Sequence, residues 1–150
     1  MKFNEFKEGM VIHHEPIVVT EEEMLAFAKL YDPQWFHTDA ARAGEGRWEG
    51  LIGSGWFTCG IAMRMAVQAA LHDSEVFASP GLEKLRWLLP VRPGDALRLE
   101  NTVDSVRVSA SRPELGIVRW TWRVYNQNDE QVLELEATNL FDLPVSEQKQ

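Results

Sequence analysis

The sequence predicts an α+β fold in which an antiparallel sheet packs against an apolar helix. Three observations support this class. Apolar and polar residues alternate with a period of two through the second half of the chain, turn-forming residues separate the alternating segments, and one segment of the first half is apolar over the length of a helix. The 150 residues, 45% of them apolar, suit one soluble domain spanning residues 1–150.

A strand followed by a helix is expected at the start. β-branched residues concentrate in 11–19, which favours a strand. Thr20 and Glu23 have the spacing of a capping box, so a helix should follow over Glu21–Tyr31. Pro33 should end this helix, because proline disfavours helical geometry in the residue before it.

A long connection and a second helix come next. The connection over 32–54 contains five glycine or proline residues, and a connection of this length in a compact domain is often functional. Ser54 is a suitable N-cap for a helix over Gly55–Leu71. This helix is apolar on most sides except for one polar stripe, formed by Arg64, Gln68 and His72. We therefore expect it to be buried nearly all round.

Four strands are expected in the second half. They cover Lys84–Leu89, Leu97–Ser109, Ile117–Asn126 and Val132–Phe141. The polar segments 111–116 and 127–130 resemble hairpin loops, so the later strands should form an antiparallel meander. Together with the first strand they make a five-stranded sheet, whose apolar face the second helix would close.

Composition excludes several classes of protein. No run of eighteen apolar residues occurs, which excludes a membrane-spanning helix. The N-terminus lacks the apolar core of a secretion signal, so we expect a cytoplasmic protein. The single cysteine, Cys59, cannot form an internal disulfide, and we expect it to be a buried, unreactive thiol. The net charge of −8 argues against a nucleic-acid partner. Only the polar tail 146–150 is expected to be flexible.

The charge is unevenly distributed. Residues 84–123 contain eight basic and four acidic residues, although the chain as a whole is acidic. Such a stretch is usually a solvated sheet face, but it could also hold a small anionic ligand such as a nucleotide-tailed thioester. On the second interpretation the phosphate contacts would come from Lys84, Arg86, Arg92 and Arg98.

One segment of the connection carries the strongest indication of chemistry. Asp32 and His37 lie five residues apart in what should be a non-helical loop, next to Trp35 and Phe36. A carboxylate and an imidazole in one apolar pocket can position and deprotonate a water molecule. The alternative is structural, since an Asp before Pro often forms a turn and a loop His is often only hydrogen-bonded.

The start of the second helix is a second candidate element. Gly53, Ser54 and Gly55 place small residues where unpaired backbone N–H groups and partial positive charge can stabilise an oxyanion. Tight packing against a strand would explain the same glycines. With the Asp32 and His37 pair, the element supplies what addition of water to a double bond conjugated to a carbonyl requires.

These residues resemble a known family. The segment Asp32-Pro33-Gln34-Trp35-Phe36-His37 resembles the hydratase motif Asp-x-Asn-Pro-Leu-His of MaoC-type dehydratases, the R-specific enoyl-CoA hydratase group. Gly55 matches the glycine that begins that family's central helix, and 85–87 and 91–95 resemble its third strand and following turn. The resemblance spans about residues 20–141. Gln34 replaces the usual Asn, and Ser54 replaces a frequent histidine, so the substrate class is left open.

The resemblance implies a hot-dog fold, in which a curved antiparallel sheet wraps around a long central helix, and a homodimer with its site near the interface. It implies hydration of trans-2-enoyl thioesters of CoA or carrier protein to 3R-hydroxyacyl thioesters, or the reverse, without metal or redox cofactor. Asp32 and His37 would activate water and transfer protons, and the Gly55 N–H would bind the enolate oxygen. Ser54, Arg86 and Arg92 would bind substrate.

Two other functions remain open on the sequence alone. A hot-dog thioesterase would direct water to the thioester carbonyl, and a non-catalytic subunit would only bind acyl thioesters.

A metal site formed by Asp32, His37 and Asp39 is not expected, because no further ligands cluster with them. The alternating tryptophans should pack in the core or at a dimer interface, or border an acyl tunnel; they are Trp87, Trp120 and Trp122.

Overall fold

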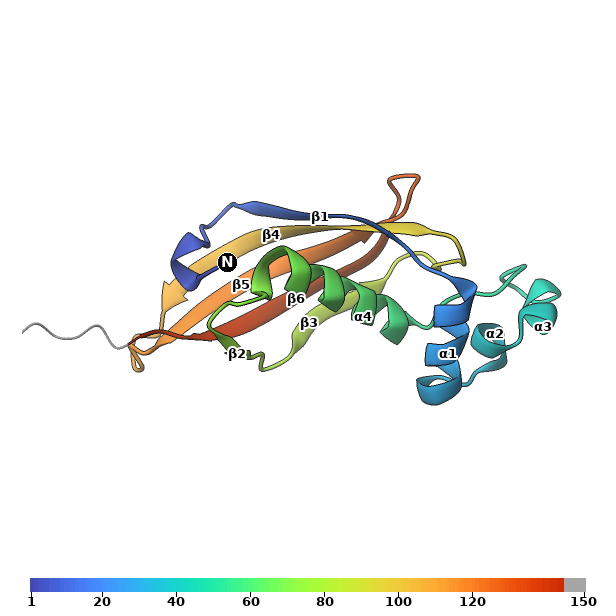
Figure 1. Cartoon of the computed structure of the whole chain (residues 1–150), viewed down its shortest axis with the longest axis horizontal. Helices are drawn as coiled ribbons and strands as arrows, with labels where there is room; N and C mark the ends of the chain where they lie inside the picture. The colour runs from blue at the N-terminus through green and yellow to red at the C-terminus, as the bar shows by residue number, and fades with distance from the viewer. Residues whose placement is uncertain (145–150) are drawn as a thin grey trace, which may run out of the picture.

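The protein forms one antiparallel sheet curved around a long helix, α4 (Gly55–Ala66), in a computed structural model that describes residues 1–144 (Figure 1). The sheet has six strands in the order β1-β4-β5-β6-β2, and β3 also pairs with β6. The strands are β1 (Val11–Val18), β2 (Val76–Ala78), β3 (Leu82–Trp87), β4 (Ala96–Val108), β5 (Leu115–Tyr125) and β6 (Gln131–Asp142). The predicted tail 146–150 lies outside the described residues.

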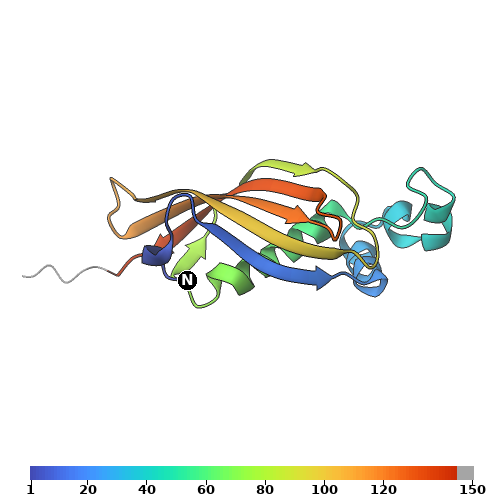
Figure 2. The same ribbon diagram turned by 90° about the horizontal axis from the view of Figure 1, so that it is seen from above.

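The remaining helices lie at the two ends of the sheet. They are η1 (Phe3–Glu5), α1 (Glu21–Tyr31), α2 (Trp35–Thr38), α3 (Ala40–Gly44) and the π-helical segment η2 (Val67–Leu71), which continues α4. Figure 2 shows α1, α2 and α3 beyond one end of the sheet, with η1 at the opposite end. No helix within residues 1–144 is long and apolar enough to cross a membrane.

Helix α1 forms where the sequence predicts it. The Thr20 hydroxyl accepts a hydrogen bond from the Glu23 N–H at 3.2 Å, and the Glu23 carboxylate accepts one from the Thr20 N–H at 3.1 Å. This capping box satisfies two N–H groups at the helix start. The helix ends at Tyr31 because Asp32, before Pro33, has non-helical backbone angles of φ −151° and ψ 68°.

The structure corrects three expectations about the elements. The sheet has six strands rather than five, because the short strand β2 pairs with the end of β6. Strand β3 covers Leu82–Trp87 rather than residues 84–89. The connection over 32–54 is not irregular throughout, since it contains α2 and α3.

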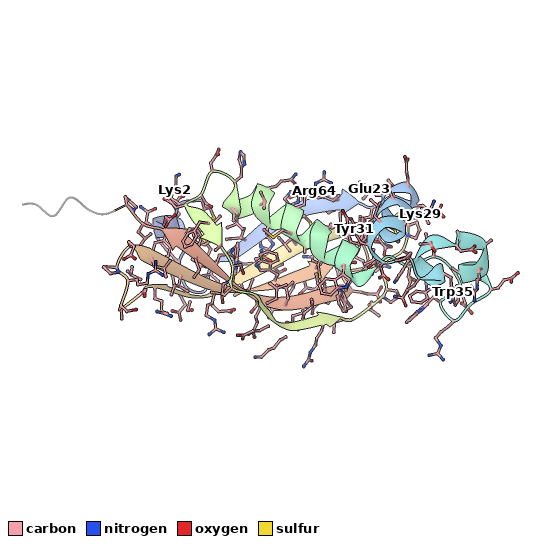
Figure 3. The ribbon with its side chains drawn as sticks, turned by 90° about the horizontal axis from the view of Figure 1, so that it is seen from below. Lys2, Glu23, Lys29, Tyr31, Trp35 and Arg64 are labelled. Atoms are coloured by element: carbon pink, nitrogen blue, oxygen red, sulfur yellow. The ribbon has the colours of Figure 1, made fainter. Side chains whose placement is uncertain are left out.

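Helix α4 is buried on one side only. Its sheet-facing side chains, including Phe57, Ile61 and Met65, join the core under β4, β5 and β6. On its outer side Trp56 is 57% exposed and Met63 43% exposed. The expectation of a helix buried nearly all round is therefore wrong for the single chain. Figure 3 looks onto this side of the molecule, with Arg64 of the predicted polar stripe labelled.

Most of the basic segment forms ion pairs with carboxylates on the outer face of the sheet or in its loops. Lys84 pairs with Glu136 at 3.1 Å and Arg123 with Glu134 at 3.1 Å. Arg98, Arg112 and Arg119 also contact carboxylates. The interpretation of this stretch as a solvated, charge-balanced sheet face thus holds for five of its basic residues, Lys84, Arg98, Arg112, Arg119 and Arg123.

Candidate active site

Asp32 and His37 meet at the end of the sheet where α1 and α4 converge. The His37 Nε2 atom lies 3.3 Å from Asp32 Oδ2, and the two side chains are 7% and 16% exposed. Asp32 stands in the extended segment after α1, whereas His37 belongs to the single turn α2. The predicted non-helical loop is therefore helical at His37, and this turn brings the imidazole back toward the carboxylate.

The hydrogen bonds of His37 determine what its second nitrogen can do. Nδ1 lies 2.8 Å from the carbonyl oxygen of Ile52. A backbone carbonyl only accepts hydrogen bonds, so Nδ1 carries a proton. In the neutral ring Nε2 is then an acceptor, and it faces another acceptor, Asp32 Oδ2. Two acceptors beside one cavity form a site for a donor with two hydrogens, such as water.

The Asp32 carboxylate is held from both sides. The Ser54 hydroxyl donates to Oδ2 at 2.7 Å, and the Gln34 amide donates to Oδ1 at 2.8 Å. Partial burial works against ionisation, but the hydrogen bonds from Ser54 and Gln34 and the adjacent His37 outweigh it, so the pKa of Asp32 lies below its usual range. The group stays a carboxylate at neutral pH.

Helix α4 begins with no side-chain cap. The sequence predicts Ser54 as its cap, but Ser54 makes no capping hydrogen bond because its hydroxyl donates to Asp32 instead. The side chain is 1% exposed. The first N–H groups of α4, beginning with Gly55, consequently lack the side-chain acceptor that an N-cap provides, next to the Asp32 and His37 pair.

These groups border a cavity of about 500 Å³, a size typical of small-molecule sites. Its polar wall includes Asp32, Gln34 and His37, and Gly53 and Gly55 line it at the start of α4. Its apolar wall includes Trp48, Ile52, Trp56, Trp87, Leu88 and Leu89. The cavity therefore combines an acid/base pair and an uncapped helix start with a hydrophobic chamber.

None of the three predicted substrate-binding residues lines this cavity. Ser54 does not line the cavity but supports Asp32. Arg86 pairs in register with Glu134 on the outer face of the sheet. Arg92 donates from Nη2 to the Trp48 carbonyl oxygen at 2.6 Å and so fixes the loop that carries Trp48. A contact between these arginines and phosphate stays a prediction.

Gln34 and Trp48 are cavity residues whose roles depend on the tertiary fold. In the motif Gln34 is a departure from the usual Asn, and in the structure its amide orients Asp32. Trp48 lines the cavity, and the one signal for it in the sequence is a large aromatic residue in a loop between two glycines, Gly46 and Gly50.

Two other candidate residues, Asp39 and Cys59, have surroundings that favour a structural role. The Asp39 carboxylate accepts from the Arg42 N–H at 3.0 Å and caps α3, and within residues 1–144 no group of three or more His, Cys, Asp or Glu side chains is arranged to hold a metal ion. Cys59 is half-buried, and burial raises the pKa of its thiol, which makes it a poor nucleophile.

Comparison with known proteins gives a consistent result. Residues 4–119 match the family model described as MaoC like domain. YdeM of Bacillus subtilis (strain 168) is 30% identical over 141 residues, covering 94% of this chain and 99% of YdeM. The crystal structure of the MaoC-like dehydratase from Rhodospirillum rubrum is 34% identical, with a TM-score of 0.85 over 95% of this chain and 97% of that one.

More distant structures share the fold. The (R)-hydratase from A. caviae is 24% identical with a TM-score of 0.75, covering 93% of this chain and 98% of that chain. A conserved hypothetical protein from Mycobacterium tuberculosis with a double hotdog fold is 15% identical, with a TM-score of 0.84 over 99% of this chain and 46% of that chain. The present chain has the hot-dog fold, as the resemblance implied.

Proposed function

Because the chain belongs to the MaoC-like domain family, we propose that it hydrates trans-2-enoyl thioesters to 3R-hydroxyacyl thioesters, or catalyses the reverse dehydration. One observation carries the proposal. His37 Nε2 and Asp32 Oδ2 lie 3.3 Å apart and both border the cavity at the uncapped start of α4. This arrangement suits a reaction that needs one bound water and one stabilised oxyanion.

The pair is suited to hold and deprotonate the water. A water molecule would donate one hydrogen to Asp32 Oδ2 and the other to His37 Nε2, which leaves an oxygen lone pair directed toward the cavity. In hydration this oxygen forms a bond to C3 of the enoyl group as one water O–H bond breaks. The released proton passes through the pair to C2, so that water is added across the double bond.

The start of α4 is suited to the negative charge. As the C3–O bond forms, electron density moves to the thioester oxygen and an enolate develops. The Gly55 N–H and the partial positive charge of the helix start would stabilise it. Three neighbouring residues would support these groups. Ser54 and Gln34 hold the Asp32 carboxylate by hydrogen bonds. The Ile52 carbonyl oxygen accepts a hydrogen bond from the protonated Nδ1 of His37 and fixes the ring.

Crotonyl-CoA and longer enoyl-CoA thioesters test the proposal. Loss of the conjugated double bond is followed by ultraviolet absorbance, and release of free thiol is followed in parallel. Asp32→Asn and His37→Ala should each lower the rate by about 100- to 10,000-fold. The double variant should be little worse than either single variant, because both groups act on the same water.

Matched controls come from the same chain. Asp39→Asn changes an acid seven residues from Asp32 but keeps an N-cap for α3, and His72→Ala removes an exposed histidine. Both should retain parent activity, and circular dichroism should show that all variants fold. Near-parent turnover in Asp32→Asn or His37→Ala would contradict the role of that residue. Thiol release without loss of the double bond would support a thioesterase, and binding without turnover a non-catalytic subunit.

We also propose that two copies assemble through the side that carries β3 and α4. Among residues 1–144, β3 pairs with β6 alone, so its other edge has free backbone groups. Large apolar side chains are exposed beside this edge: Trp56, Met63, Phe77, Leu82, Trp87, Leu88 and Leu89. A second copy is the partner that fits, because two identical antiparallel edges are self-complementary. Such an interface would cover the apolar side of α4.

A further inference from the structure

Two cavities lie along α4; Trp87 lines the first, and its side chain contacts Cys59, which lines the second. The cavity that contains Asp32 and His37 is lined by Gly55 and Thr58 of α4. The second cavity, of about 380 Å³, is lined on the same helix by Cys59, Gly60 and Met63. Its remaining walls come from β3, β5, β6 and Ser79, and include Leu82, Trp122 and Leu135. The two spaces thus follow one another along the helix.

Several contacts fix the Trp87 indole in this position. Its Nε1–H donates to the Gly55 carbonyl oxygen at 2.9 Å, and its ring lies against the Gly55 Cα, where any Cβ would collide with the indole. The Trp56 ring meets it edge-on, with centroids 5.4 Å apart. In the sheet Trp87 pairs with Leu133, a core residue, which directs the indole toward the helix rather than the outer face.

We propose that Trp87 is the end wall of the acyl site and restricts the enzyme to short acyl chains, an inference that rests on the proposed function. With the thioester oxygen at the Gly55 N–H, an acyl chain that extends along α4 reaches the indole before it can reach Cys59 and Met63. The second cavity follows α4 from Cys59 to Met63, over which the helix rises about 6 Å, and this is the further length that it would add. Trp87 is therefore a specificity-determining residue.

The second cavity makes the proposal testable, because removal of the wall should open an apolar space that already exists. Its lining is mostly hydrophobic, with Met63, Leu82, Leu135 and Ala137 among its residues. A chain that enters it should gain about fourfold in affinity for each methylene group buried. In the parent protein this gain should stop at the chain length at which the acyl end meets Trp87.

The experiment measures dissociation constants of saturated acyl-CoA thioesters, from butyryl-CoA to dodecanoyl-CoA, by titration calorimetry. In the parent protein affinity should rise with length and then level off or fall. In Trp87→Ala the rise should continue to longer chains. Trp87→Phe is the matched control, since it loses the hydrogen bond to Gly55 but keeps an aromatic ring in place, and it should retain the parent's length limit.

A second substitution tests where the longer chains go. Cys59→Phe, added to Trp87→Ala, places a ring in the second cavity and should abolish the gain for long chains while leaving butyryl-CoA binding unchanged. An unchanged length limit in folded Trp87→Ala would overturn the proposal. An equal shift of the length limit in Trp87→Phe would also overturn the proposal, because loss of the hydrogen bond to Gly55 would then explain the shift. If Trp87→Ala does not fold, Trp87→Leu takes its place with the same expected direction.

Binding of saturated thioesters needs no turnover, which separates this inference from the proposed function. A parent protein that hydrates no enoyl thioester but shows the length limit and its release would contradict the hydratase proposal and support the role of Trp87. A parent that hydrates short and long enoyl thioesters equally well would support the hydratase and overturn the end wall.

Discussion

The carboxylate of Asp32 illustrates how two neutral donors can prepare an acid/base group. Ser54 and Gln34 each stabilise the charged form, so we predict that Ser54→Ala raises the pKa of Asp32 toward its ordinary value. Titration of the Asp32 side-chain ¹³C resonance by NMR measures this directly. Ser79→Ala, a serine with no contact to Asp32, should leave the resonance unchanged, and an unshifted Asp32 in Ser54→Ala would show that its hydroxyl is not a determinant.

The same shift predicts a pH dependence of stability. Asp32 has a folded-state pKa below the reference value of 3.8, so its stabilising contribution is complete above that value and is lost as pH falls through the lower folded pKa. The difference in unfolding free energy between the parent and Asp32→Asn should therefore be constant near neutral pH and shrink below about pH 4. Urea denaturation across this range checks it. A difference that grew on acidification would contradict the direction of the shift.

The sequence predicts Asp32, His37 and Gly55 as site residues, and the structure places all three at one cavity, but the sequence does not show how their groups are held. Spacing within a motif is local, and these three residues could be found from spacing and resemblance. The Ser54 hydroxyl could serve either its own helix or a carboxylate 22 positions earlier, and only the tertiary fold decides between them. The same holds for Arg92, whose partner at Trp48 lies 44 positions away.

At the scale of elements, helix α4 predicts opposite effects for its two glycines, Gly55 at the start and Gly60 in the middle. Alanine is favoured over glycine within helices by about 1 kcal/mol. At Gly60 no heavy atom beyond the neighbouring residues and backbone of its own helix lies within 4 Å of an added Cβ, so Gly60→Ala should stabilise the protein by about 0.5 to 1 kcal/mol. At Gly55 the added methyl would collide with the Trp87 indole, and Gly55→Ala should destabilise by about 1 to 3 kcal/mol.

Urea denaturation at one fixed protein concentration compares the two variants with the parent. Stabilisation by both alanines would mean that the indole moves aside without cost and that its contact with Gly55 does not hold it in place. This outcome would also weaken the case for Trp87 as a fixed wall.

Elements were predictable where local signals agreed. The capping box and Pro33 defined α1 to the residue, and alternation located β4, β5 and β6 to within two residues. Strand β2 has three residues and is defined only by its pairing with the end of β6, so no local period reveals it. Helices α2 and α3, of four and five residues, are too short to show a helical period. The Arg42 guanidinium over the Trp35 ring, 4.4 Å from its centroid, links these two turns.

At the scale of the whole molecule, the side that carries β3 and α4 predicts the oligomeric state. Light scattering should give the mass of a dimer at micromolar concentration. Leu82→Glu and Met63→Glu place charges on this side and should shift the protein toward monomer. Leu30→Glu is the matched control, because Leu30 is 74% exposed on α1, away from β3, and its variant should remain dimeric. A monomeric parent, or dimers in all three variants, would contradict this interface.

The position of β6 in the sheet has a consequence for how the chain folds during synthesis. β6 comes last in the sequence, yet it lies between β5 and the short strands β2 and β3, which have no other partner within residues 1–144. Until Gln131–Asp142 has emerged from the ribosome, both short strands lack their partner and one edge of β5 has unpaired backbone groups. The sheet can therefore be completed only after the five other strands have been made, which places its closure against α4 late in folding.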